Sequence, residues 1–309
     1  MIKRIRKTIK RKIKPLTYPV TTWLVIFLGS VFRKMGWETA RKTAWLLGDF
    51  VFYVPRIRRK LVEKNLARTF PDKDLPEIRR IARQVYRNQA MNIIEMLRIP
   101  LIKNKDDARE LVEIRIDDHL RQRIDQQKGA VLFSGHLGSW ELIGFCTAML
   151  LGPLNSIVKP IKNKPLNKYL HDLRTLQGHK LIYKDSAARQ GLKVLKNGEL
   201  LGVLGDQSNK SGDFYIDFLG RKAPIFMGPA FWALKAGVPL FVEVSKRLDN
   251  GRYLVDIFEI PSSDLSYNRE DIKILATRYT RALEDFILEY PEEWLWLHDR
   301  WKRSPAARS

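Results

Sequence analysis

Residues 129–151 read GAVLFSGHLGSWELIGFCTAMLL, and this run combines a short apolar segment, a glycine-flanked loop and a longer apolar segment. The segment 129–135 is short and bounded by glycine, which predicts a buried strand. Residues 139–151 predict a helix. His136 lies in the loop between them, where the carboxyl end of the strand meets the helix. In an open α/β sheet, such loops carry the chemistry.

The rest of the chain repeats this alternation of short apolar runs and helical periodicity. The periodicity of residues 75–97 predicts a long helix with five apolar residues on one side: Ile78, Ile81, Val85, Ile93 and Leu97. Further strands are expected at 154–161, 180–183, 200–207, 239–248 and 252–260, and further helices at 165–178, 186–199, 227–237 and 268–289. The pattern predicts an α/β fold with a mixed, mostly parallel sheet covered by helices on both faces.

The charge of the chain is strongly positive. Its 309 residues include 56 Lys and Arg against 34 Asp and Glu, a formal net charge of +22. A field of this sign favours anionic partners, which include nucleic acid, acidic lipid and acidic protein. Cys146 is the single cysteine, so an intramolecular disulfide is excluded.

The N-terminal region has the pattern of a membrane anchor. Residues 1–14, MIKRIRKTIKRKIK, carry eight basic residues and four isoleucines at helical spacing. The uncharged stretch 18–32 is shorter than the roughly 20 residues that a spanning helix needs. A second apolar stretch, 44–55, contains Asp49, and basic residues flank the first stretch on both sides. We therefore expect an anchor over 1–35 that dips into the membrane from its cytoplasmic side, rather than a cleaved signal peptide, followed by one domain over 36–309.

The spacing of His136 and Glu141 constrains how they could act together. Five helical steps would separate the two side chains by about 140°, so contact requires His136 in the loop and Glu141 in the first helical turn. Gly138 permits a tight turn, and Ser139 is a good N-cap. Glu141 could then orient the imidazole, which would act as a general base, while helix-opening N–H groups stabilise an oxyanion.

Simpler interpretations of the same residues stay open. A histidine between glycines, followed by a helix-opening glutamate, is also compatible with plain helix capping. A metal site is not expected, because the five histidines are scattered and none stands at ligand spacing to His136. Cys146 lies in an apolar helix and is expected to be packed rather than nucleophilic, and residues 202–207, GVLGDQ, lack the ending of a phosphate-binding loop.

Several short motifs together resemble the bacterial lipid A biosynthesis acyltransferases, within the lysophospholipid acyltransferase superfamily. They occur in order along nearly the whole chain: RRKLVEKNLARTFPD (58–72), GHLGSWE (135–141), DQ (206–207), FLGRKAPIFMGPAFWALKAGVPL (218–240) and YPEEWLWLHDRWK (290–302). The superfamily is marked by a histidine, four residues and an acidic residue. One departure is visible: Leu137 and Ser139 replace the usual Phe and Asn.

The resemblance implies a glycerolipid acyltransferase-like fold and assigns roles to single residues. His136 is the implied general base and Glu141 its orienting carboxylate. The other implied site residues, which bind substrate or shape the oxyanion site, are Arg174, Gly138, Ser139, Asp206, Gln207 and Arg300, the last within a closing motif that includes Trp301 and Lys302.

The implied activity is membrane-attached O-acyl transfer without cofactor or metal. The expected donor is an acyl-acyl carrier protein, the acceptor an anionic lipid A precursor, and the place of action the cytoplasmic face of the cell inner membrane. The acceptor could instead be a lysophospholipid, an aminolipid or a glycosylated phosphoinositide. Two other classes remain: a membrane-tethered nucleic-acid-binding protein, disfavoured because no nucleic-acid module is recognised, and a thioesterase.

Overall fold

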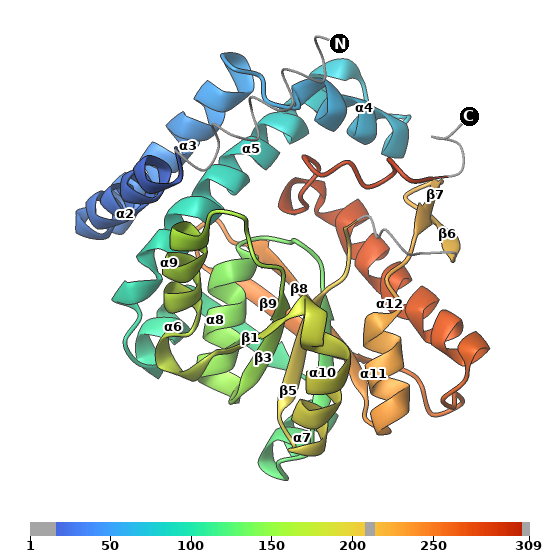
Figure 1. Cartoon of the computed structure of the whole chain (residues 1–309). Coiled ribbons are helices and arrows are strands. Elements are labelled where there is room, and N and C mark those ends of the chain that lie inside the picture. Colours follow the sequence, from blue (N-terminus) through green and yellow to red (C-terminus); the bar gives the residue numbers. More distant parts are fainter. Residues whose placement is uncertain (1–16, 208–213, 305–309) are drawn as a thin grey trace, which may run out of the picture.

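The structure is a computed structural model and describes residues 17–207 and 214–304. The basic segment predicted to lie on the membrane, residues 1–14, falls outside the described residues. Figure 1 shows one central sheet between two layers of helices, with further helices from the N-terminal part of the chain above it. The predicted α/β architecture is confirmed.

The central sheet has seven strands in the order β1-β9-β8-β2-β5-β3-β4. All neighbouring pairs in it are parallel except β8 with β9, so the sheet is mixed and mostly parallel, as predicted. Strand β2 lies in the middle, between β5 and β8, and its first four residues are fully buried. The seven strands of the sheet are β1 (Val112–Ile116), β2 (Ala130–Ser134), β3 (Leu154–Val158), β4 (Lys180–Tyr183), β5 (Leu200–Leu204), β8 (Leu240–Arg247) and β9 (Tyr253–Ile260).

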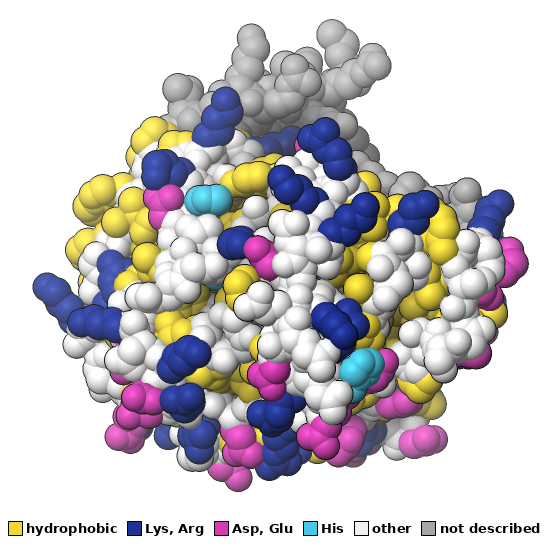
Figure 2. Space-filling view, turned by 90° about the horizontal axis from the view of Figure 1, so that it is seen from below, with side chains coloured by type: hydrophobic (Ala, Val, Ile, Leu, Met, Phe, Trp, Pro, Cys, Tyr) yellow, Lys and Arg dark blue, Asp and Glu magenta, His cyan; other side chains and the backbone are white. Residues whose placement is uncertain are grey.

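Helices cover both faces of this sheet, as its apolar strands require. One face carries α10 (Ala187–Lys196), α11 (Gly228–Ala236) and α12 (Arg269–Glu289). The other face carries α6 (Lys105–Leu111), α8 (Trp140–Leu151) and α9 (Lys164–Arg174), while α7 (Asp118–Asp125) contacts β9. On the side seen from below in Figure 2, basic and acidic side chains are mixed.

The N-terminal helices pack on one long helix, α5 (Leu75–Arg98), which begins at the capping residue Asp74. They are α2 (Tyr18–Lys34), α3 (Trp37–Tyr53) and α4 (Arg59–Thr69). Asp49 of α3, the acid within the second apolar stretch, pairs with Arg83 and Arg87 of α5 at 2.6 and 2.7 Å. Within the part of the chain that the structure describes, no helix is both long and apolar enough to span a bilayer.

Two sequence-based expectations differ from the structure. Ile93 is 62% exposed, whereas its neighbour Ile94 is buried, so the buried side of α5 includes Ile94 and not Ile93. A separate antiparallel hairpin, β6 (Tyr215–Phe218) with β7 (Arg221–Pro224), and the edge strand β1 were not predicted. Four 3-10 turns complete the described elements: η2 (Ile99–Leu101), η3 (Leu176–Gly178), η4 (Lys184–Ser186) and η5 (Pro291–Glu293).

Candidate active site

The loop after β2 presents His136 at the carboxyl edge of the sheet, and two glycines make that loop possible. Gly138 adopts φ +49°, a left-handed conformation, and a Cβ there would lie 2.9 Å from the Ser245 hydroxyl. A Cβ on Gly135 would lie 3.1 Å from Leu283 of α12. The predicted tight turn between strand and helix is therefore confirmed, and it is packed from both sides.

Asp206 fixes the position of His136. Its Oδ2 accepts the backbone N–H of His136 at 3.0 Å, and its Oδ1 lies 2.6 Å from the ring Nδ1. The indole N–H of Trp294 donates to the same carboxylate at 2.8 Å. With Nδ1 facing a carboxylate, the neutral imidazole carries its proton on Nδ1 and leaves Nε2 as the basic nitrogen.

Gln207 lies beside Nε2, the basic nitrogen of His136. Its side-chain amide nitrogen lies 3.1 Å from Nε2 of His136, an amide orientation that makes Nε2 the acceptor. The ring of Trp140 packs edge-on against His136 with the centroids 5.0 Å apart. A hydroxyl group that donates to Nε2 would occupy the side of the ring that Gln207 now contacts.

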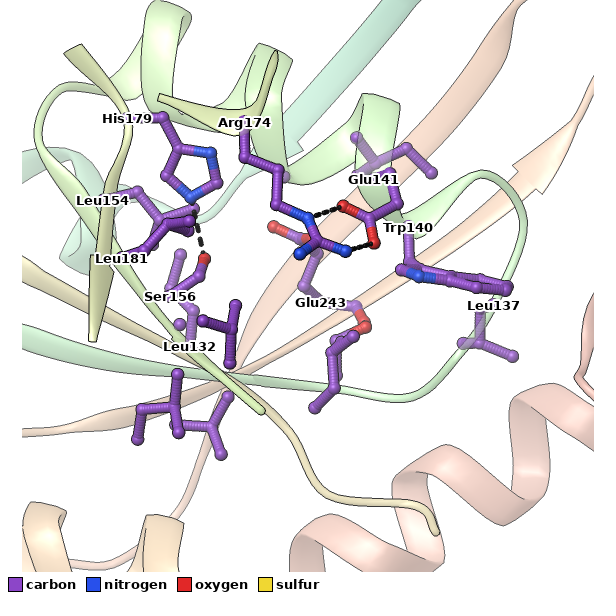
Figure 3. A pocket seen from close by; sticks show the side chains of 18 of the residues that line it. Leu132, Leu137, Trp140, Glu141, Leu154, Ser156, Arg174, His179, Leu181 and Glu243 are labelled. Atoms are coloured by element: carbon purple, nitrogen blue, oxygen red, sulfur yellow. Dashed lines mark hydrogen bonds and ion pairs between the residues drawn. The ribbon is translucent and has the colours of Figure 1, made fainter. Parts of the chain in front are cut away.

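Glu141 does not make the predicted hydrogen bond to His136. Its carboxylate instead forms a two-point ion pair with Arg174, at 2.7 Å to Nε and 2.5 Å to Nη2 (Figure 3). The reason is topological: β5 is hydrogen-bonded directly beside β2, which brings Asp206 to His136, while the first turn of α8 faces the end of α9. Glu141 still acts on His136 through its charge.

Burial and nearby charges shift the pKa values of His136 and Asp206 in opposite directions. Burial would lower the pKa of His136, but the charge of Asp206, the hydrogen bond to it and the charge of Glu141 raise that pKa above its ordinary value of 6.5. Burial would raise the pKa of Asp206, but contacts with His136 and Trp294 hold that pKa well below its usual range. Asp206 is therefore an anion that strengthens the basicity of the histidine.

A cavity of about 90 Å³ lies next to this site, beneath the Glu141–Arg174 pair. Apolar side chains of β2, β3, β4, β5, α8 and the loop before α8 form much of its lining: Leu132, Leu137, Ile143, Leu154, Leu181 and Leu204. Figure 3 shows Arg174 and Glu141 directed toward each other beside this cavity, and His179 directed toward Ser156. Ser156 lies 2.9 Å from Nε2 of His179, and burial lowers the pKa of His179 to about 4.

One buried carboxyl group in the cavity lining was not predicted. Glu243 of β8 accepts from the Thr147 hydroxyl at 3.2 Å, and burial raises the pKa of Glu243 to about 7. The sequence does contain a signal, because Glu243 is the only acid within the apolar run 239–248. A carboxyl group there must be buried and costs free energy unless it is neutral or bonded.

Three of the predicted site residues have less direct positions. Ser139 stands at the N-cap of α8, but its side chain makes no capping hydrogen bond and is fully buried. The N–H of Gly138 donates to the carbonyl of Glu293 at 3.0 Å, so this N–H is already used within the protein. Arg300 is 1% exposed and lies over the ring of Phe218.

Across residues 17–207 and 214–304, no three His, Cys, Asp or Glu side chains gather at metal-binding geometry.

The family model of the bacterial lipid A biosynthesis acyltransferases matches residues 7–303. The chain belongs to this family. The expected family is thus confirmed, and the chain is an acyltransferase.

Relatives within this acyltransferase family differ in what their names say they act on. The chain is 24% identical to the lipid A biosynthesis lauroyltransferase of Escherichia coli over 286 residues, which cover 92% of each chain. It is 25% identical to the phosphatidylinositol mannoside acyltransferase of Mycolicibacterium smegmatis over 250 residues, 78% of each chain. It is 22% identical to the lipid A biosynthesis palmitoleoyltransferase of Escherichia coli over 255 residues, 82% of this chain and 81% of the relative.

Proposed function

We propose that the protein is a membrane-attached O-acyltransferase that moves a fatty acyl chain from an acyl-acyl carrier protein to a hydroxyl of a lipid A precursor. The observation that carries the proposal is the geometry of His136, whose Nδ1 faces Asp206 and whose Nε2 is left to take a proton. A positioned base of this kind is what attack by a hydroxyl on a thioester requires.

The chemistry follows from the placement of these groups. Nε2 of His136 takes the proton of the acceptor hydroxyl, and the resulting oxygen attacks the thioester carbonyl carbon. N–H groups in the first turn of α8 have no acceptor within the helix and favour negative charge there. Arg174 holds Glu141 through Nε and Nη2, which leaves Nη1 for the carbonyl oxygen. The tetrahedral intermediate then collapses, the C–S bond breaks, and the thiol leaves with the proton from His136.

Direct transfer suits this site better than a covalent enzyme intermediate. Burial raises the pKa of the Cys146 thiol to about 12, which makes a thiolate nucleophile unfavourable. Ser156 contacts His179, but a histidine with a pKa of about 4 is a poor base at neutral pH. The cavity beneath Glu141 and Arg174 offers apolar walls to the acyl chain of the donor.

The acceptor has one supported alternative. Relatives of similar identity are named for lipid A and for phosphatidylinositol mannoside. Both names describe phosphorylated glycolipids, so a glycosylated phosphoinositide is the second candidate acceptor. We favour the lipid A precursor because the lauroyltransferase match covers 92% of both chains.

Membrane attachment is supported by the outer sides of α2 and α3, which together we call the apolar face. This face consists of exposed apolar side chains: Val20, Trp23, Leu24 and Phe27 on α2, and Leu46, Leu47 and Phe50 on α3. Trp23 is 65% exposed and Leu46 is 71% exposed. Along the chain, the basic residues Arg33, Lys34, Arg41 and Lys42 lie between its two halves. Exposed apolar side chains near basic residues suit insertion into the cytoplasmic surface of the anionic inner membrane.

The test is transfer of a labelled acyl chain from acyl carrier protein to a lipid A precursor in detergent. We expect transfer by the wild type, loss of transfer in His136→Ala and a strong reduction in Glu141→Ala. His119→Ala changes an exposed histidine on α7 and is the matched control. His136→Ala as active as the wild type would refute the mechanism.

The same assay separates the remaining functions. Transfer to a phosphatidylinositol mannoside precursor, but not to the lipid A precursor, would replace the acceptor. Fatty acid released at full rate without any acceptor lipid would indicate a thioesterase. Salt-sensitive binding to any duplex, with no acyl transfer, would indicate a nucleic-acid-binding protein.

A further inference from the structure

A second, open pocket of about 510 Å³ lies at the carboxyl ends of β3 and of the edge strand β4. Its lining combines lysines with a paired histidine and tyrosine: Lys162, Lys164, Lys168, His171 and Tyr183, together with Pro160, Ile161 and Asn167. The Tyr183 hydroxyl lies 3.1 Å from Nδ1 of His171, and the two rings are nearly parallel. The pocket therefore has an ordered floor and a basic rim.

The positive charge of this rim is largely uncompensated. Lys168 pairs with Asp172 at 2.6 Å. For Lys162, Lys164 and the neighbouring Lys184, all of them exposed, no acidic partner occurs among the residues that the structure describes. Such a cluster attracts a polyanionic partner and speeds its binding.

Helix α9 carries the basic rim and its contacts with α2 and α5 on different sides. Tyr169 and Leu173 belong to the side of α9 that packs with α2 and α5, where Arg33 donates to the Tyr169 hydroxyl. Lys164 and Lys168 lie on the other side of the same helix, in the pocket. Asn163, between Lys162 and Lys164, donates to the Tyr18 carbonyl and the Thr21 hydroxyl of α2, so the rim adjoins that helix. The charge of the rim, rather than its distance from the bilayer, favours an acidic protein partner.

The pocket is also connected to the candidate active site. Arg174, the last residue of α9, pairs with Glu141, and His171 of the pocket stands one turn before it. In the sheet order β2-β5-β3-β4, β4 lies three strands from the strand before His136. At ~4.8 Å per strand, a ligand group in the pocket would be about 14 Å from the His136 loop. A long, flexible prosthetic arm is needed to bridge that distance.

We propose that this pocket and its lysines are the docking surface for the acyl carrier protein. Acidic side chains of the carrier would meet Lys162, Lys164 and Lys184, and the phosphate at the base of its pantetheine arm would enter the pocket. The arm would then run along the carboxyl edge of the sheet, and its thioester would reach His136. This inference rests on the proposed donor and adds the surface that recognises it.

The experiment compares two donors that carry the same acyl thioester, acyl carrier protein and free acyl-pantetheine. We expect Lys162→Glu/Lys164→Glu to raise the KM for acyl carrier protein by roughly tenfold or more, with little change in kcat and a weaker salt dependence. Transfer from acyl-pantetheine stays unchanged. Lys193→Glu/Lys196→Glu reverses two exposed charges on α10 and is the matched control.

Direct binding keeps the two proposals distinguishable. Fluorescence anisotropy of labelled holo-carrier protein should show weaker binding to the pocket variant than to the wild type and the control. Equal binding of the carrier protein to the wild type, the pocket variant and the control would overturn the proposed docking surface. An equal loss of transfer from both donors in the pocket variant would overturn it as well. A loss of binding to anionic vesicles instead of carrier protein would assign the lysines to the membrane. A wild type inactive with both donors would refute the proposed function, whereas the anisotropy would still report on docking.

Discussion

Asp206 binds His136 at two points, its backbone N–H at 3.0 Å and its ring Nδ1 at 2.6 Å. The same carboxylate receives the indole N–H of Trp294, so residues from three distant parts of the chain meet at one anion. This arrangement gives Asp206 the positioning role that spacing alone had suggested for Glu141, and it leads to distinct outcomes for substitutions at the two acids.

Asp206→Asn should lower transfer by roughly 10²- to 10⁴-fold, because the amide no longer fixes the tautomer or stabilises the imidazolium. In the wild type, the rate should rise with pH through a pKa above 6.5, since His136 must be neutral to accept a proton. Removing the negative charge lowers that pKa, so the rising limb moves to lower pH. The check is the pH profile of kcat/KM.

Trp294→Phe should act in the same direction as Asp206→Asn, with a smaller effect. It removes one hydrogen bond to Asp206 but leaves both contacts to His136, so the limb should move less. A normal rate and an unshifted limb in Asp206→Asn would show that the carboxylate has no part in catalysis.

Glu141 and Arg174 should behave as one unit. Glu141→Gln and Arg174→Gln each break the two-point ion pair, so the double variant should be little worse than the poorer single variant. We expect a coupling energy of roughly 1–3 kcal/mol in a double-mutant cycle on kcat/KM. Two results together would contradict this and indicate that Glu141 is the partner of His136. The effects of the two substitutions would be additive, and Glu141→Gln would shift the pH profile of kcat/KM as far as Asp206→Asn does.

The apolar face should control membrane binding without controlling chemistry. Trp23→Ser/Phe27→Ser removes two stacked aromatic rings from α2, each worth about 1.5–3 kcal/mol when buried in lipid. Sedimentation with anionic vesicles should show at least about a tenfold loss of bound protein. Tyr267→Ser removes an exposed aromatic ring far from α2 in the sequence and should leave binding unchanged. Equal binding by both variants would contradict the assignment.

Glu243→Gln should stabilise the protein at high pH. The folded pKa of Glu243 is about 7 against an ordinary 4.5, so both states are protonated at low pH and carry no penalty. As pH rises from 4.5 to about 7, this carboxyl group ionises in the unfolded chain before it ionises in the folded protein. The free energy of unfolding therefore falls, by up to about 3 kcal/mol above pH 7. Glutamine stays neutral and avoids this cost.

Urea unfolding at about pH 5 and about pH 8 measures this difference between the variant and the wild type. The gain in unfolding free energy from Glu243→Gln should be larger at the higher pH. Glu289→Gln, at an exposed position on α12, should show no such trend. A gain that is the same at both pH values would mean that the carboxyl group is ionised throughout or solvated.

The local features of this protein could be predicted from the order of its residues. The strand–loop–helix around His136, the two tight glycines and the α/β alternation follow from residue type and short spacing, and these act within one or two turns of chain. The resemblance of the motifs to a family also named Asp206 and Gln207 as site residues, without placing them.

Which side chains meet depends on how the strands and helices are arranged in the fold. Asp206 reaches His136 because β5 is paired directly with β2, and Glu141 meets Arg174 because α8 begins opposite the end of α9. The exposure of Ile93 and the buried Glu243 likewise depend on what packs against α5 and β8. Strand order and helix contacts join residues far apart in the sequence, and hydrophobic periodicity specifies only which face is buried, not which partner covers it.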